Sequence, residues 1–243
     1  MTTKLYLLDV EGTTSPISLV SEQLFPYARK HLRSFLRDRI DEPEVRADLA
    51  LLAEENQSET EPGAPVVEAE WDVADDLEQG CAYLLWLMDR DRKSTALKSL
   101  QGKIWKAGFE AGELLGTVFP DVPEALARWT SPPHEAWVAI YSSGSVEAQK
   151  LLFRYSSVGD LTSYISAYFD TRVGPKTAAE SYRAIAAAMG VATGEILFVS
   201  DLVRELDAAR EAGYLTRLSV REGNQPVADV RGHLTIRSFT EIA

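Results

Sequence analysis

Short apolar runs that end in turn or polar residues recur along the chain. Continuous apolar runs of this length are typical of strands buried on both faces of a parallel sheet. The runs are Lys4–Leu8, Trp137–Tyr141, Tyr164–Phe169 and Ile196–Ser200, and the strings "YLTRLSV" and "LTIRS" predict the final strands. Helical spacing of apolar residues separates them, as over Val146–Arg154, over Thr177–Met189 and in a later helix that ends at Gly213. This alternation predicts an α/β fold with a parallel sheet covered by helices.

The segment between the first two predicted strands has a different pattern. Its apolar residues recur at helical spacing over Leu24–Phe35, with Ser21 as a candidate N-cap, over Val73–Met88 and over Leu97–Ile104. The acidic segment Glu54–Pro65 predicts an exposed loop. Because roughly a hundred residues far exceed an ordinary crossover, we expect two domains. They are an α/β core over residues 1–18 and 118–243 and a helical insertion over residues 19–117.

Composition narrows the class of protein. The 243 residues are 45% hydrophobic and 26% charged, as in an ordinary globular chain that buries a sizeable core. The formal net charge of -12 argues against nucleic acid and anionic membranes as partners. The single cysteine, Cys81, excludes an intramolecular disulfide and a cysteine-based zinc site, and low cysteine use favours the cytoplasm. We expect neither a signal peptide nor a transmembrane helix.

Acidic residues follow two of the predicted strands, at the edge where open parallel sheets bind ligands. Asp9 and Glu11 follow the first strand. In one interpretation Asp9 is a nucleophile and Glu11 a general acid and base. In the other, the segment is a turn in which Asp9 caps backbone amides. Asp201 follows the run Ile196–Ser200, where a carboxylate can bind Mg²⁺ or cap the next helix. Glu205 lies one helical turn further on, and we expect it to orient a neighbouring group.

Hydroxyl and ammonium groups occupy two further positions of this kind. Ser142 and Ser143 can hold a phosphate oxygen or cap a helix. Lys176 can neutralise a phosphate or remain a surface lysine. Neither serine lies in a G-x-S-x-G elbow, which argues against a serine hydrolase. The string "GPKT" lacks the first glycine of a nucleotide-binding phosphate loop, which argues against a nucleoside triphosphatase.

The order acid pair, hydroxyl, lysine, acid resembles the haloacid dehalogenase superfamily of phosphotransferases, with glutamate in the second acidic position of "DVEGTT". Longer strings are similar to the enolase-phosphatase family of methionine salvage, whose members are also called acireductone synthases. These strings include "DVEGTTSPISLV", "LQGKIW", "YSSGSVEAQKLLF" and "SDLVRELDAAREAG". The resemblance extends from about residue 5 to about residue 220. It implies a Rossmann-like core of the haloacid dehalogenase type with an inserted all-helical cap domain.

This resemblance also implies a two-step reaction. The expected substrate is 2,3-diketo-5-methylthiopentyl-1-phosphate, which is first enolised to 2-hydroxy-3-keto-5-methylthiopentenyl-1-phosphate. Hydrolysis through an aspartyl phosphate then gives the acireductone 1,2-dihydroxy-3-keto-5-methylthiopentene and phosphate. The alternatives are another Mg²⁺-dependent small-molecule phosphatase of the superfamily, or a non-catalytic phosphate-binding module. The resemblance further implies a monomer.

The residue roles carry over from the same resemblance. Asp9 is expected to be the nucleophile, Glu11 the proton shuttle, and Lys176 the group that offsets the charge of phosphate and nucleophile. Ser142 and Ser143 are expected to bind phosphate oxygens together with Lys176. One Mg²⁺ per chain is expected at Asp9, at the backbone carbonyl of Glu11 and at Asp201.

Overall fold

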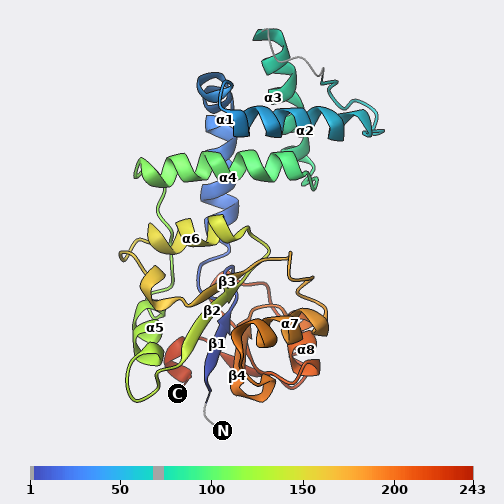
Figure 1. Ribbon diagram of the computed structural model, residues 1–243. Coiled ribbons are helices and arrows are strands. Elements are labelled where there is room, and N and C mark those ends of the chain that lie inside the picture. The colour runs from blue at the N-terminus through green and yellow to red at the C-terminus, as the bar shows by residue number, and fades with distance from the viewer. Residues whose placement is uncertain (1–2, 68–73, 243) are drawn as a thin grey trace. The chain divides into compact units, whose positions relative to one another are not determined.

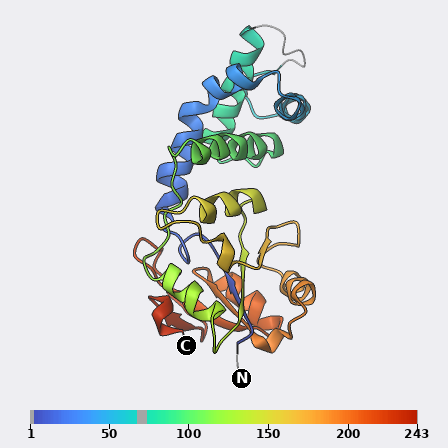
Figure 2. The same ribbon diagram turned by 60° about the vertical axis from the view of Figure 1, so that its left-hand side comes forward.

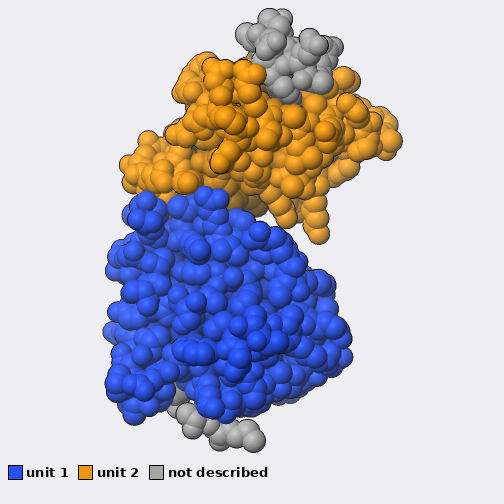
Figure 3. Space-filling view, in the orientation of Figure 1, with its two compact units in different colours: residues 1–22, 114–243 blue, residues 23–113 orange. Residues whose placement is uncertain are grey.

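The protein is described here from a computed structural model, which covers residues 3–67 and 74–242. The chain divides into two compact units, coloured separately in Figure 3. Unit 1 comprises Met1–Glu22 and Leu114–Ala243, and unit 2 comprises Gln23–Glu113. The predicted insertion, 19–117, is slightly longer than unit 2 at both ends.

Unit 1 is built on a six-stranded sheet in which every neighbouring pair of strands is parallel (Figure 1). Its order is β3-β2-β1-β4-β5-β6, which confirms the predicted α/β class. The strands are β1 (Leu5–Leu8), β2 (Trp137–Tyr141), β3 (Ala167–Phe169), β4 (Ile196–Ser200), β5 (Leu215–Ser219) and β6 (Leu234–Ile236). The predicted run Tyr164–Phe169 is strand only in its last part, because a 3₁₀ turn occupies Thr162–Tyr164.

The strand order reverses direction at β1. The chain adds β2 and β3 on one side of β1 and then returns to add β4, β5 and β6 on the other. Leu8 pairs with Ile140 of β2 and with Val199 of β4, so the three central strands end at nearly the same level. Ligands bind at such switch points in open α/β sheets. The residues that follow β2, β1 and β4 are therefore brought together.

Helices cover both faces of this sheet (Figures 1 and 2). Leu5 and Leu7 belong to an apolar cluster with α7 and α8, whereas Tyr6 points the other way and stacks on Trp129 of α5 at 4.1 Å between ring centroids. α5 was not predicted from the sequence, although its buried residues Val122, Ala125, Leu126 and Trp129 lie at helical spacing. The helices of unit 1 are α5 (Val122–Thr130), α6 (Val146–Arg154), α7 (Ala179–Met189) and α8 (Val203–Glu211).

Unit 2 is helical and has its own apolar core, which includes Leu32, Leu49, Leu84 and Leu100. One such residue comes from each of its helices, so each helix buries one face against the others. The helices are α1 (Phe25–Arg39), α2 (Pro43–Gln57), α3 (Ala74–Asp89) and α4 (Thr95–Glu110). Among residues 3–67 and 74–242, no helix is long and apolar enough to cross a membrane.

Two local predictions in this region were wrong. Ser21 is not an N-cap, because a π-helical turn over Leu19–Leu24 leads directly into α1, and the Ser21 hydroxyl donates to the carbonyl of Ile17 at 3.5 Å. The predicted loop from Glu54 starts too early, because α2 continues to Gln57. The prediction for Val73 lies outside the described residues.

Candidate active site

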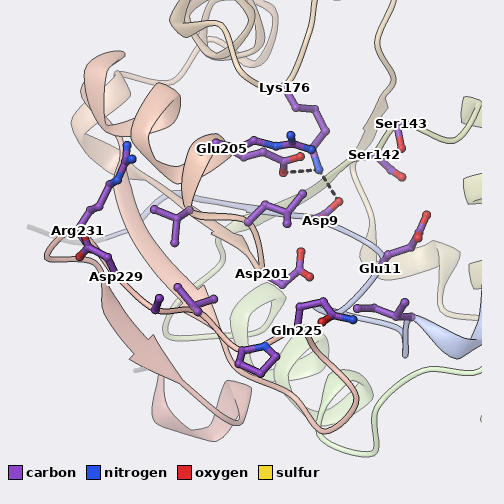
Figure 4. Close-up of a pocket in the computed structure, with 17 residues that line it drawn as sticks. Asp9, Glu11, Ser142, Ser143, Lys176, Asp201, Glu205, Gln225, Asp229 and Arg231 are labelled. Atoms are coloured by element: carbon purple, nitrogen blue, oxygen red, sulfur yellow. Dashed lines mark hydrogen bonds and ion pairs between the residues drawn. The ribbon is translucent and has the colours of Figure 1, made fainter.

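A cavity of about 780 Å³ lies at the carboxyl ends of the strands of unit 1 (Figure 4). It is lined by every residue that the sequence nominated for the site. These residues are Asp9, Glu11, Ser142, Ser143, Lys176 and Asp201. Strands β1, β2, β3 and β4 each bring one loop to the same edge, which explains why residues so distant in sequence meet here.

Lys176 lies at the centre of the charge network. Its Nζ atom is 2.6 Å from Oδ1 of Asp9 and 2.6 Å from Oε2 of Glu205, as the dashed lines of Figure 4 show. All three side chains are less than a tenth exposed. Burial alone would lower the pKa of Lys176, but the two carboxylates outweigh burial and raise it. Lys176 is therefore a charged interior residue and not the surface lysine that the sequence left open.

The loop before α7 is held so that Lys176 points inward. The hydroxyl of Tyr182 donates to the carbonyl of Lys176 at 2.7 Å, and the hydroxyl of Tyr141 donates to the carbonyl of Gly174 at 2.9 Å. Gly174 has a φ of +136°, and a Cβ there would collide with the Ser181 hydroxyl. These ties delay the start of α7 to Ala179, two residues later than predicted.

Asp9 leaves β1 with its backbone amide donating to the carbonyl of Val199 at 3.0 Å. The next residues turn tightly around the carbonyl of Val10, which accepts from the amides of Thr13, Thr14 and Ser15 at 3.2, 3.0 and 2.9 Å. Because that carbonyl satisfies the turn amides, the Asp9 carboxylate is not needed as a cap. It is 5% exposed and points to Lys176.

Glu11 lies on the same side of Asp9 as Ser142 and Ser143, whereas Glu205 lies on the other (Figure 4). It is half-buried in the cavity wall. Burial, followed by the negative charge of Asp9, raises the pKa of the Glu11 carboxyl. A carboxyl with a raised pKa exchanges a proton more readily near neutral pH. Its environment therefore suits a general acid and base.

Asp201 follows β4 and does not cap the next helix. The N-cap position of α8 is Leu202, whose amide donates to the hydroxyl of Ser200 at 3.1 Å. Burial, followed by the charges of Asp9 and Glu205, raises the pKa of Asp201 to about 7. The charge of Lys176 acts in the opposite direction and lowers the pKa, but burial and the two carboxylates outweigh it. The site therefore has an excess of negative charge on the Asp201 side.

The chemistry of the oxygen donors on this side fits a magnesium ion. Mg²⁺ prefers a few carboxylate and carbonyl oxygens together with water and substrate phosphate. Gly12, at φ +67°, passes so close that a Cβ there would be 2.6 Å from Oδ2 of Asp201. Within the part of the chain that the structure describes, no three His, Cys, Asp or Glu side chains form a metal-binding group. A cation held here would need main-chain or amide oxygens in addition to the carboxylates of Asp9 and Asp201.

The two serines after β2 are not the cap of α6. That role belongs to Ser145, whose hydroxyl accepts from the amide of Ala148 at 3.2 Å. The Ser142 hydroxyl accepts from the amide of Gly144 at 3.2 Å, and Ser143 is exposed within the cavity wall. A hydroxyl that accepts one hydrogen bond still has a proton to donate. Both hydroxyls are therefore compatible with holding an anion.

One wall of the cavity was not predicted from the sequence. The segment between β5 and β6 lines it with Gln225, Asp229 and Arg231, among others. Arg231 forms an ion pair with Asp207 of α8 at 2.8 Å. The signal in the sequence was the polar string "REGNQP", which follows a strand of the same sheet and therefore leaves it at the same edge.

Comparisons with known proteins agree with this geometry. Residues 3–213 match the family model of the haloacid dehalogenase-like hydrolases. The chain is 50% identical over 236 residues to an enolase-phosphatase E1 of Synechococcus elongatus, covering 97% of this chain and 96% of the relative. It is 46% identical over 243 residues to an enolase-phosphatase E1 of Pseudomonas aeruginosa, covering 100% and 99%.

Solved structures share the fold of this chain. The UTR4 protein of Saccharomyces cerevisiae superposes with a TM-score of 0.80 at 35% identity, covering 99% of this chain and 100% of that one. A dehalogenase with an intermediate complex superposes with a TM-score of 0.56 at 18% identity, covering 99% and 95%, which shows a shared fold. The chain belongs to the haloacid dehalogenase-like hydrolases and, within them, to the enolase-phosphatase E1 family.

Proposed function

We propose that the chain is an enolase-phosphatase that converts 2,3-diketo-5-methylthiopentyl-1-phosphate to 1,2-dihydroxy-3-keto-5-methylthiopentene and phosphate in methionine salvage. Family membership over nearly the full chain supports the reaction class. The observation that carries the proposal is the placement of Asp9 at the switch point of the sheet, paired with a buried Lys176. We also propose that residues 19–117 form the cap domain, that the protein is a monomer, and that it is located in the cytoplasm.

The phosphatase step begins with Asp9. Its carboxylate attacks phosphorus, forming an O–P bond to the enzyme as the bond between phosphorus and the substrate oxygen breaks. Glu11 gives a proton to that leaving oxygen. Water then attacks the aspartyl phosphate while Glu11 recovers a proton from it, and phosphate and free Asp9 result. Lys176, with Ser142 and Ser143, binds the phosphate oxygens and offsets their charge.

Magnesium would be held, one ion per chain, by the carboxylates of Asp9 and Asp201 and by the main-chain carbonyl of Glu11. When bound, it supplies charge stabilisation for the transferring phosphate. This role matches the electrostatics, because five carboxylates and only three cationic side chains line the cavity. A doubly charged phosphate would add to the imbalance, and like charges about 4 Å apart repel by roughly 4 kcal/mol at a surface-like dielectric.

The enolase step needs a base that removes a proton from the carbon bearing the phosphate ester. We assign this role to Glu11 as well, because its half-buried carboxyl lines the same cavity as Asp9 and has a raised pKa. A positioned acid or base contributes about 10²–10⁴-fold to a rate. Glu11→Gln should therefore slow both steps by a factor of this order.

The test is to supply the diketone phosphate with Mg²⁺ and to follow enol absorbance and phosphate release together. We expect enol formation followed by phosphate release in the wild type, loss of phosphate release in Asp9→Asn, and slowing of both signals in Glu11→Gln. Asp160→Asn, which does not line the cavity, is the matched control. Hydrolysis of a chromogenic phosphate but not of the diketone would favour another phosphatase of the superfamily. Inactivity on both compounds would favour a phosphate-binding module.

A further inference from the structure

Asn224 has a buried side-chain oxygen that is not satisfied by any of the residues that the structure describes. Among the described residues, its Oδ1 atom has no hydrogen-bond partner and is closed to solvent. Its Nδ2 atom donates to the carbonyl of Gly12 at 2.9 Å and to the carbonyl of Ser219 at 3.2 Å. The two donated bonds identify which end of the amide is nitrogen. A buried acceptor left without a donor costs about 1–3 kcal/mol, so its retention calls for an explanation.

The unsatisfied oxygen faces Asp201 across Gly12. A Cβ on Gly12 would lie 2.8 Å from Oδ1 of Asn224 and 2.6 Å from Oδ2 of Asp201. Two acceptor oxygens thus border the same small space beside the Asp9 loop. They repel each other unless a cation or a hydrogen-bond donor lies near both.

The backbone holds Asn224 in this place. The carbonyl of Gly12 accepts from Asn224 and also from the hydroxyl of Ser219, at 3.0 Å. The segment after β5 is therefore tied to the turn after β1, although Gly12 and Asn224 are 212 residues apart. Gly12 directly follows Glu11, whose carbonyl is one of the proposed magnesium ligands, so Asn224 is hydrogen-bonded to the residue next to that ligand.

We propose that Asn224 is a positioning residue of the magnesium site, with Oδ1 as an acceptor toward the hydrated cation held by Asp9 and Asp201. Mg²⁺ keeps several of its waters, and such waters need acceptors beyond the direct ligands. Outer partners of this kind typically change metal affinity by about 10–100-fold. The inference rests on the magnesium part of the proposed function.

The test measures Mg²⁺ affinity by titration calorimetry and by the magnesium-induced rise in melting temperature, without substrate. Asn224→Ala should weaken binding by about 10–100-fold. Asn224→Asp keeps an oxygen there and adds negative charge, so its affinity should stay near that of the wild type or exceed it. A role limited to holding the loop predicts that both variants weaken binding alike, because both lose the Nδ2 donor.

Asn56 provides the matched control. Its Nδ2 atom donates to the carbonyl of Pro65 at 2.9 Å and its Oδ1 atom accepts from the amide of Val67 at 2.8 Å, so its amide is satisfied within unit 2. Asn56→Ala should lower the melting temperature without changing Mg²⁺ affinity. Unchanged affinity in Asn224→Ala, or equal weakening in both Asn224 variants, would overturn the inference. Absence of Mg²⁺ binding by the wild type would instead refute the proposed magnesium site.

Discussion

The buried ion pair between Asp121 and Arg221 gives a quantitative test of how unit 1 is held together. Both terminal guanidinium nitrogens are engaged, with Nη2 of Arg221 2.9 Å from Oδ2 of Asp121 and Nη1 3.0 Å from Oδ1. The Arg221 side chain is 5% exposed and the Asp121 side chain 13%. The guanidinium lies 4.6 Å from the Phe119 ring centroid and 4.8 Å from that of Phe239. Arg221 also donates to the carbonyl of Thr13, so the pair supports the turn after Asp9.

The expected effect of Asp121→Asn follows from these distances. At about 2.9 Å and an effective dielectric near 20, the attraction is roughly 6 kcal/mol before desolvation is counted. Arginine does not lose its proton in proteins, so the variant leaves a buried charge without its counter-ion. Breaking one side of a buried pair typically costs about 3–5 kcal/mol. We expect Asp121→Asn to lower the free energy of unfolding by that amount at pH 7.

The effect should depend on pH in a defined direction. Burial alone would raise the pKa of Asp121, but hydrogen bonds from Arg221 and the Phe239 amide outweigh it and lower the pKa. A lowered folded-state pKa gives stability that is present above the unfolded value, about 3.9, and is lost as the pH falls through the folded value. The difference between wild type and Asp121→Asn should therefore be constant down to about pH 4 and shrink below it.

Urea unfolding followed by tryptophan fluorescence measures this difference. The buried Trp129 is near the ion pair, because its ring centroid lies 5.3 Å from that of Phe239, the ring that the Arg221 guanidinium contacts. Glu180→Gln is the control, since the exposed pair of Glu180 and Arg183 at 2.9 Å should contribute less than about 1 kcal/mol. A loss in Asp121→Asn no larger than in the control would refute the reasoning. So would a difference that persists unchanged well below pH 4.

Three further predictions concern the site. Gly12→Ala should displace Asp201 and so reduce phosphate release by about a hundredfold. Its control is Gly190→Ala, because Gly190 has a similar φ of +66° but an added Cβ would have nothing within 4 Å. This control should lower the free energy of unfolding in urea by about 1–2 kcal/mol and leave activity unchanged. Ser145→Ala should lower the free energy of unfolding by about 1 kcal/mol, because it removes the N-cap of α6. Ser143→Ala should leave the free energy of unfolding unchanged but raise the KM for the phosphate ester. Excess chelator should abolish turnover and added Mg²⁺ should restore it; full activity in chelator would contradict the mechanism.

The sequence by itself determined the fold class and the loops that carry the site. Continuous apolar runs identified β1, β2 and β4 because a strand buried on both faces has no polar position. The polar residues that follow them were then candidates, since parallel strands present their carboxyl ends at one edge. These are local patterns, and a single stretch of chain expresses each of them. The strings that resemble enolase-phosphatases narrowed the reaction, and the comparisons confirmed that family.

Only the tertiary structure decided which polar groups pair with which. Asp9 and Lys176 are 167 residues apart, and their pairing depends on the strand order, which no local pattern expresses. The contact of Asn224 with Gly12 depends in the same way on how loops pack at the end of the sheet. Hydrophobic periodicity specifies which residues are buried. The partner of each buried charge follows from the three-dimensional arrangement of the loops, because a hydrogen bond requires a distance near 3 Å and a fixed direction.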